Sequence, residues 1–183
     1  MRVIAGSAKG TRLYGAKGYR VRPITDRIKE SLFDLLGDTV EGTRVLDLFA
    51  GVGSLGIEAL SRGAAHADFI EKHRATAYSI TKNLERARLA VSGRVIVAGL
   101  PGGISRARGA YGLIFVDPPF RIDWRLLEEL FRLIRARGLL GPGGLLIYRR
   151  SPKSGYGPRA SEWSMAEGRD YGDSIVSIYK LSD

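Results

Sequence analysis

The sequence predicts an α/β fold in which a mostly parallel β-sheet is covered by helices on both faces. Stretches with the apolar spacing of helices alternate with short strand-like stretches along most of the chain. The early strand-like stretches are continuous apolar runs, which is typical of parallel strands buried on both sides. The length of 183 residues corresponds to one domain. We expect this domain at 26–183, preceded by a basic arm or β-hairpin at 1–25.

The first predicted helix covers residues 26–36. Thr25 and Asp26 can cap its N-terminus, and Gly37 can end it. Apolar residues at helical spacing give this helix one face for burial, made of Ile28, Leu32, Phe33, Leu35 and Leu36.

The next predicted elements alternate between strand and helix. A strand at 44–49 leads through a glycine-rich turn at 50–56 into a helix that Gly63 ends. The strand, helix and strand that follow are expected at 67–71, 73–90 and 94–98.

The second half of the chain continues this pattern. Strands are predicted at 112–117 and 145–148, with a helix between them at 123–137. A terminal strand near a sheet edge is expected at 174–181, because apolar and polar residues alternate there. Residues 149–173 show no pattern that assigns an element.

The composition excludes several kinds of site. The chain has no cysteine, which excludes disulfides, thiolate zinc sites, iron–sulfur clusters and cysteine nucleophiles. His66 and His73 are its only histidines, and their spacing is not that of metal ligands, so we expect no metal. No apolar run is long enough to span a membrane, and the start lacks the apolar core of a signal peptide. We therefore expect a cytoplasmic protein.

The charge balance favours a polyanionic partner. Lysine and arginine number 29 against 19 aspartates and glutamates, which gives a formal net charge of +10. The first 36 residues hold eight basic and three acidic side chains. Such a local excess favours nucleic acid as the partner, although a solvated basic face would have the same composition.

A glycine-rich loop offers a cofactor site. Residues 51–56, Gly-Val-Gly-Ser-Leu-Gly, match GxGxxG and lie between a predicted strand and a predicted helix, as the motif requires. Glycines permit a ligand to approach the backbone closely, and the helix N-terminus offers free N–H groups. Glu71, 20 residues after Gly51, is placed to accept the two hydroxyls of a ribose.

Asp47, four residues before Gly51, bears on the choice of cofactor. A buried carboxylate suits a ligand that carries an ammonium group, such as S-adenosylmethionine (SAM), whereas it would repel the pyrophosphate of a dinucleotide. SAM is therefore favoured, and a dinucleotide or a turn without any ligand remain the alternatives.

The segment Asp117-Pro118-Pro119-Phe120 directly follows a predicted strand. Its two prolines remove two backbone donors, which leaves the carbonyls of Asp117 and Pro118 free to accept hydrogen bonds. A nucleobase with an exocyclic amine can stack on the aromatic ring and donate both amine hydrogens to the carboxylate and a carbonyl. These acceptors localise the amine lone pair, so that it can attack an electrophilic methyl group. The alternative is a strand terminator with an aromatic plug.

With these motifs, the chain resembles the bacterial RsmD family of class I SAM-dependent methyltransferases. Two segments, 47–56 and 117–120, resemble such amino-methyltransferases in general. The resemblance to the RsmD family itself rests on its two N-terminal signatures and their continuation, at residues 2–6 with 9–10, 22–33 and 56–64.

This resemblance implies a Rossmann-like fold with a seven-stranded sheet and a basic N-terminal hairpin. It implies transfer of a methyl group from SAM, leaving S-adenosylhomocysteine, to N2 of one guanine in 16S ribosomal RNA, in the head of the 30S subunit near the P site. It further implies an assembled or nearly assembled 30S subunit as the substrate, a monomer, no metal and no membrane partner. The alternatives are adenine-N6 methylation of DNA or RNA with the same residues, a non-catalytic RNA-binding factor, and an oxidoreductase.

The resemblance also implies residue roles. The SAM site would consist of Thr25, Asp47, Phe49, Ala50, Gly51, Gly53, Glu71, Lys72, Gly99, Leu100 and Asp117. The target site would consist of Asp117, Pro118, Pro119 and Phe120, and the RNA side would include Arg2, Lys9, Arg12, Arg22 and Arg27. The chain departs from the family at Gly99, where an Asn or Asp usually lies beside the cofactor adenine. A backbone group near Leu100 is the expected replacement.

Two further groups of residues have no assigned role. Trp124 and Trp163 are expected to pack in the core or at its rim, with stacking on RNA bases as the alternative. Arg149, Arg150 and Lys153 follow a predicted strand and are expected to contact phosphates or to face water.

Overall fold

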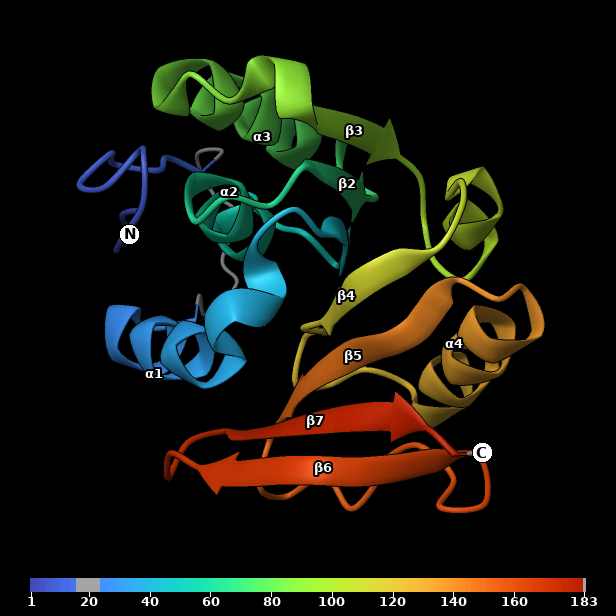
Figure 1. The fold of residues 1–183 in the computed structure, drawn as a ribbon. Coiled ribbons are helices and arrows are strands. Elements are labelled where there is room, and N and C mark those ends of the chain that lie inside the picture. The colour runs from blue at the N-terminus through green and yellow to red at the C-terminus, as the bar shows by residue number, and fades with distance from the viewer. Residues whose placement is uncertain (16–23, 183) are drawn as a thin grey trace.

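A computed structural model describes residues 1–15 and 24–182, which form a seven-stranded sheet with helices on both faces (Figure 1). The strand order is β3-β2-β1-β4-β5-β7-β6. The first five strands run parallel, and β7 and β6 join antiparallel. The predicted fold class is confirmed. The strands are β1 (Arg44–Leu48), β2 (His66–Glu71), β3 (Gly93–Val97), β4 (Tyr111–Val116), β5 (Leu140–Arg150), β6 (Trp163–Asp170) and β7 (Ile175–Leu181).

Two apolar layers hold the helices on the sheet. Successive strand residues point to opposite faces, so Val45 and Phe115 pack with α1, α2 and α3, while Leu46 and Ile114 pack with α4. This burial on both sides explains the continuous apolar strands of the sequence. The helices are α1 (Asp26–Leu36), α2 (Ser54–Ser61), α3 (Arg74–Ala87) and α4 (Trp124–Ala136), with short 3-10 helices η1 (Gly37–Val40), η2 (Ala90–Ser92) and η3 (Gly102–Arg106).

Local signals fix most helix ends where the sequence predicts them. The Thr25 hydroxyl accepts a hydrogen bond from the backbone N of Ile28 at 3.3 Å, which caps α1. Asp123 caps α4 in the same way. Gly37 follows α1 with a φ of 49°, a conformation that favours glycine. Helix α3 ends three residues earlier than predicted, where Arg88 adopts a left-handed conformation.

The C-terminal part of the sheet differs from the sequence prediction. Strand β6 forms within 149–173, where the sequence predicts no element. It was missed because seven of its eight residues are exposed and show no apolar pattern. It occupies the sheet edge, and β7 lies one place further in. Strand β5 begins at Leu140, before the predicted residue 145, and its register against β4 shifts between Tyr111 and Leu113.

Residues 1–15 are packed along α2 and the neighbouring α3 (Figure 1). A single antiparallel bridge joins Arg2 and Arg12, so the segment is hairpin-like without an extended ladder. Val3 and Leu13 are buried, with 1% and 6% of their surface exposed, and belong to the same apolar cluster as α1 and α2. The start of the chain thus contributes to the core of the domain.

A buried polar cluster fastens this segment to the helices. The Glu58 carboxylate accepts hydrogen bonds from the backbone N of Ile4 at 2.8 Å and of Ala5 at 3.0 Å. Lys29 lies 3.2 Å from the same carboxylate, and both side chains are fully buried. Burial lowers the pKa of Lys29, and the charge of Glu58 opposes that shift. The charges of Lys29 and Glu58 therefore compensate each other in the protein interior.

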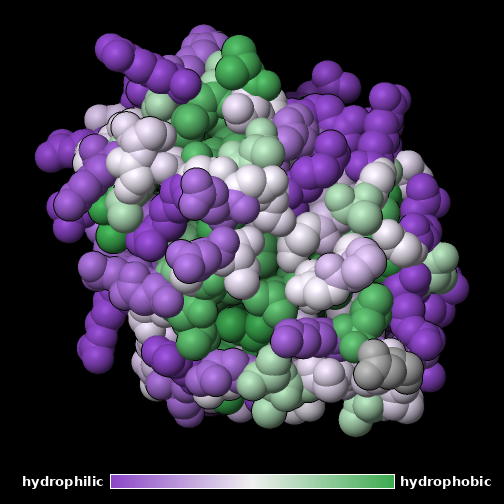
Figure 2. Space-filling view, in the orientation of Figure 1, coloured by the Kyte–Doolittle hydropathy of each residue, from purple (hydrophilic) through white to green (hydrophobic). Residues whose placement is uncertain are grey.

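The surface agrees with the charge balance of the sequence. Hydrophilic side chains cover most of the face in Figure 2, around a hydrophobic hollow below the centre of the view. Within the described part of the chain, no helix is long and apolar enough to cross a lipid bilayer.

Candidate active site

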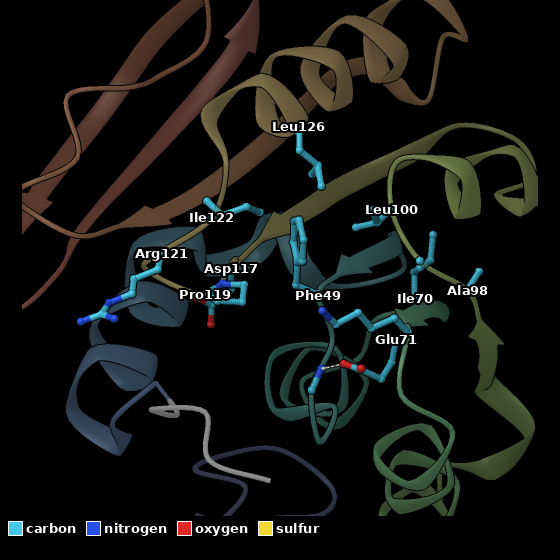
Figure 3. A pocket seen from close by; sticks show the side chains of 13 residues that line it. Phe49, Ile70, Glu71, Ala98, Leu100, Asp117, Pro119, Arg121, Ile122 and Leu126 are labelled. Carbon is cyan, nitrogen blue, oxygen red and sulfur yellow. Dashed lines mark hydrogen bonds between the residues drawn. The ribbon is translucent and has the colours of Figure 1, made fainter.

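A cavity of about 350 Å³ opens beyond the carboxyl ends of β1, β2 and β4 (Figure 3). The strand order changes direction between β1 and β4, and ligands of open α/β sheets bind at such a switch point. The volume lies within the range of small-molecule sites. The cavity is lined by Phe49, Gly51, Ile70, Glu71, Lys72, Ala98, Gly99, Leu100, Asp117, Pro119, Arg121, Ile122 and Leu126.

Each glycine of the loop has its own structural reason. Gly51 and Gly53 have φ values of 57° and 84°, which side chains rarely adopt. Gly56 lies inside α2, where an added Cβ would come within 2.3 Å of the Phe69 ring. The first two glycines therefore shape the turn, and the third lets the helix approach β2.

Glu71 holds the glycine loop beside the cavity. One carboxylate oxygen accepts a hydrogen bond from the backbone N of Gly51 at 3.0 Å, as the dashed line in Figure 3 shows. The other oxygen accepts from the backbone N of His73 at 2.8 Å. Each oxygen keeps a further lone pair, so Glu71 can still accept hydroxyls of a ligand.

Asp47 lies next to the cavity without lining it. Its carboxylate is 2% exposed and accepts a hydrogen bond from the backbone N of Gly56 at 3.0 Å. Burial raises the pKa of Asp47 to about 8, and the nearby Asp117 and Glu71 carboxylates act in the same direction, against the hydrogen bond from Gly56. A cationic ligand would relieve this repulsion, and an anionic one would increase it.

Asp117 is held by a buried arginine. The Nε and Nη2 groups of Arg149 donate to Oδ1 and Oδ2 of Asp117 at 2.6 and 3.1 Å. The side chains of Arg149 and Asp117 are 8% and 16% exposed. Burial raises the pKa of Asp117, and the charge of Arg149 opposes the shift. The Arg149 guanidinium also lies 5.2 Å from the centre of the Phe120 ring.

The expectation that Arg149 contacts phosphate or faces water is therefore wrong. Ile147, two residues earlier in β5, packs in the core, and alternate strand residues share one face of a sheet. This spacing was the signal in the sequence that places Arg149 inward. Its neighbour Arg150 bonds instead to backbone oxygens of the loop after β5, at Ser151 and Ser154.

The three residues after Asp117 lie in different environments. Pro118 is buried, Pro119 lines the cavity, and Phe120 is 36% exposed outside the lining. Phe49 enters the cavity after β1, and its φ of 62° is an outlier for a bulky residue. Such strained backbone clusters at ligand sites.

The far end of the cavity is apolar. Ala98, Gly99 and Leu100 line it together with Ile70. None of the described residues that line this end is an Asn or Asp, so a ligand ring would contact aliphatic surface and the backbone of this segment.

The remaining predicted site residues are not among the cavity-lining set. The hydroxyl of Thr25 caps α1, Ala50 is buried and bonded to β2, and Gly53 begins α2. The basic residues Arg2, Lys9, Arg12 and Arg27 are exposed on the N-terminal side, while Arg22 lies outside the described residues. In residues 1–15 and 24–182, no group of three histidines or acids is arranged to hold a metal ion.

Comparison with known proteins gives consistent matches over almost the whole chain. The family model described as conserved hypothetical protein 95 matches residues 1–180. The putative rRNA methyltransferase YlbH of Bacillus subtilis is 35% identical, with 98% of each chain covered. The ribosomal RNA small subunit methyltransferase D of Escherichia coli K12 is 33% identical, over 98% of this chain and 89% of that protein. A solved structure of the putative methyltransferase yhhF from Escherichia coli is similar with a TM-score of 0.87 and 34% identity, covering 100% of this chain and 98% of that one.

Proposed function

The chain belongs to the RsmD family, conserved hypothetical protein 95, and we propose that it methylates the exocyclic N2 amine of a guanine in 16S ribosomal RNA with SAM as methyl donor. The observation that carries the chemistry is Asp117, which is partly buried at the cavity and oriented by Arg149. We further propose that the substrate is the head of an assembled or nearly assembled 30S subunit, which would place the monomeric protein in the cytoplasm.

The residues around the cavity fit SAM. Asp47 lies in a cluster of carboxylates that favours an ammonium group nearby, and Glu71 can accept ribose hydroxyls. Phe49 and Leu100 offer apolar surface for an adenine ring. When bound, SAM supplies an electrophilic methyl group. A dinucleotide is disfavoured, because the carboxylates around the cavity would repel its pyrophosphate.

The target amine is activated by acceptors from this chain. The Asp117 carboxylate and the backbone carbonyl of Pro118 can accept the two amine hydrogens, which draws the nitrogen toward tetrahedral geometry. Because Arg149 engages both oxygens of Asp117, the carboxylate cannot rotate away from one orientation. After transfer, the methylated nitrogen loses one proton to Asp117 or to water. No covalent intermediate is needed.

The basic N-terminal side fits the proposed RNA substrate. Arg2, Lys9, Arg12 and Arg27 are exposed, and the chain carries a formal charge of +10. Phosphate contacts give RNA binding without base specificity, so specificity for one guanine has to come from the target site and its rim.

The test compares Asp117→Ala with Asp38→Ala, an exposed carboxylate in η1 that does not line the cavity. We expect Asp117→Ala to abolish methyl transfer to 30S subunits while the Kd for SAM stays within a few fold, and Asp38→Ala to remain active. Retained turnover in Asp117→Ala, or loss of SAM binding together with turnover, would contradict the assigned role.

A further inference from the structure

The two tryptophans of the chain have opposite environments. Trp163 is 2% exposed and packs in the apolar cluster beneath α4, as expected from the sequence. Trp124 is 50% exposed and packs at the rim of the same cluster, against the partly buried Tyr156, which is the second of the two expected environments. Ile122 and Leu126, two residues to either side, line the cavity, and Figure 3 shows Leu126 reaching toward it. Trp124 therefore lies at the start of α4 beside the rim of the cavity, but its ring does not line the cavity, because residues two apart in a helix point to different sides.

The ring of Trp124 is fixed by its surroundings. It is the first residue of α4, whose start is capped by a 3.0 Å hydrogen bond from the backbone N of Arg125 to Asp123. The Tyr156 ring lies 5.9 Å away at 44°, and the Arg125 guanidinium lies 5.4 Å from the ring centre. An exposed aromatic ring held in one place loses little conformational entropy when a partner stacks on it.

The same rim carries positive charge. Arg121 borders the cavity, and Figure 3 shows its side chain reaching outward from the loop, away from Phe49. Of the acids nearby, Glu128 and Glu129 pair with Arg159 and Arg132, and the exposed Asp123 accepts a hydrogen bond from the backbone N of Arg125. The start of α4 therefore offers an exposed aromatic ring with Arg125 beside it and Arg121 three residues earlier.

We propose that Trp124 is the platform on which an unpaired nucleotide next to the target guanine stacks, with Arg121 and Arg125 contacting its phosphates. Stacking on an exposed ring combined with arginine contacts is how proteins hold single-stranded RNA. A guanine that enters the cavity has left its own stack, so its neighbours need a new surface. A protein partner is less suited, because the chain carries a formal net charge of +10, which favours a polyanion. This inference rests on the proposed RNA substrate.

The kinetic test uses Trp124→Ala, with Trp124→Phe as the conservative variant and Tyr78→Ala as the control. Tyr78 is 63% exposed on α3, so it matches Trp124 in type and exposure. We expect Trp124→Ala to raise KM for 30S subunits by roughly 5- to 150-fold, the range that base stacking gives. The kcat and the Kd for SAM should stay within about twofold, as for a surface residue outside the chemistry. Trp124→Phe should recover most of the loss, and Tyr78→Ala should behave as wild type.

A binding test separates this inference from the proposed function. A short single-stranded RNA is titrated into wild type and Trp124→Phe, and the difference in tryptophan fluorescence isolates Trp124. We expect salt-sensitive quenching of that difference signal. An unchanged KM in Trp124→Ala, or no quenching, would overturn the inference even if wild type methylates 30S subunits. Quenching without any methylation of 30S subunits would support RNA stacking on Trp124 and contradict the proposed methyltransferase function.

Discussion

Replacing Arg149 by methionine removes the partner of Asp117 and leaves the carboxylate in place. Methionine keeps much of the aliphatic volume of the arginine stem but provides neither charge nor donor. Two hydrogen bonds, at 2.6 and 3.1 Å, and the contact with the Phe120 ring are lost together. Asp117 then remains buried beside Asp47 without a counter-charge.

The size of the effect follows from this burial. Removing one partner of a buried ion pair costs about 3–5 kcal/mol, and we take the lower end because the Asp117 side chain is 16% exposed. Without the guanidinium, burial raises the pKa of Asp117 further, so a smaller fraction of the enzyme has the ionised carboxylate at neutral pH. Each 1.4 kcal/mol corresponds to about tenfold in rate, so a loss of about 3 kcal/mol in the orientation and ionisation of Asp117 should lower transfer by roughly 100- to 150-fold.

The assay is the rate of methyl transfer to 30S subunits as a function of pH, alongside the Kd for SAM. A raised Asp117 pKa means that activity returns only as pH rises above it, so the profile of Arg149→Met should shift to higher pH. Arg150→Met, which loses only bonds to backbone oxygens of Ser151 and Ser154, should keep the wild-type profile. A normal rate in Arg149→Met, or a lower rate with an unshifted profile, would refute the positioning role.

Two further substitutions test the cofactor site and the glycine loop. Asp47→Asn should stabilise the protein without ligand, because the raised pKa of Asp47 means that the carboxyl contributes stability at low pH and loses it as pH rises from about 4 to about 8. The excess in Tm over wild type should therefore grow between pH 5 and pH 8 while SAM affinity falls; a constant or negative difference would contradict the account. Gly56→Ala should lower the free energy of unfolding by about 1–3 kcal/mol, because its Cβ would lie 2.3 Å from the buried Phe69 ring. Gly102→Ala, which meets no atom within 4 Å, is the control, and equal melting curves for the two variants would rule out the packing explanation.

The features that sequence reasoning predicted are those set by local patterns. Helix α1 follows from Thr25, an apolar face and Gly37, all within one segment of chain. The cavity between β1, β2 and β4 follows from chain order, because parallel strands bring their carboxyl ends to one edge. Gly51, Glu71 and Asp117 could be placed there without knowing any tertiary contact.

The features that it missed depend on contacts between distant segments. Strand β6 is stabilised by antiparallel pairing with β7, and the pattern of its own mostly exposed residues does not predict a strand. Arg149 meets Asp117 across 32 residues of sequence, and only the pairing of β4 with β5 brings them together. Glycine-rich composition and charge indicated an arm at the start of the chain, whereas the isolated apolar residues Val3 and Leu13 anchor this segment to the core.

The proposed methylation is tested by identifying the modified nucleoside. Labelled SAM is incubated with the protein and, in parallel reactions, with 30S subunits from a strain that lacks the corresponding methylation or with DNA, and the digested nucleic acid is examined by mass spectrometry. We expect N2-methylguanosine at a single site of the 16S RNA. Label in DNA as N6-methyladenine would agree with the chemistry proposed for Asp117 but contradict the proposed RNA substrate. Absence of transfer to either substrate, despite SAM binding, would contradict the proposed methyltransferase activity.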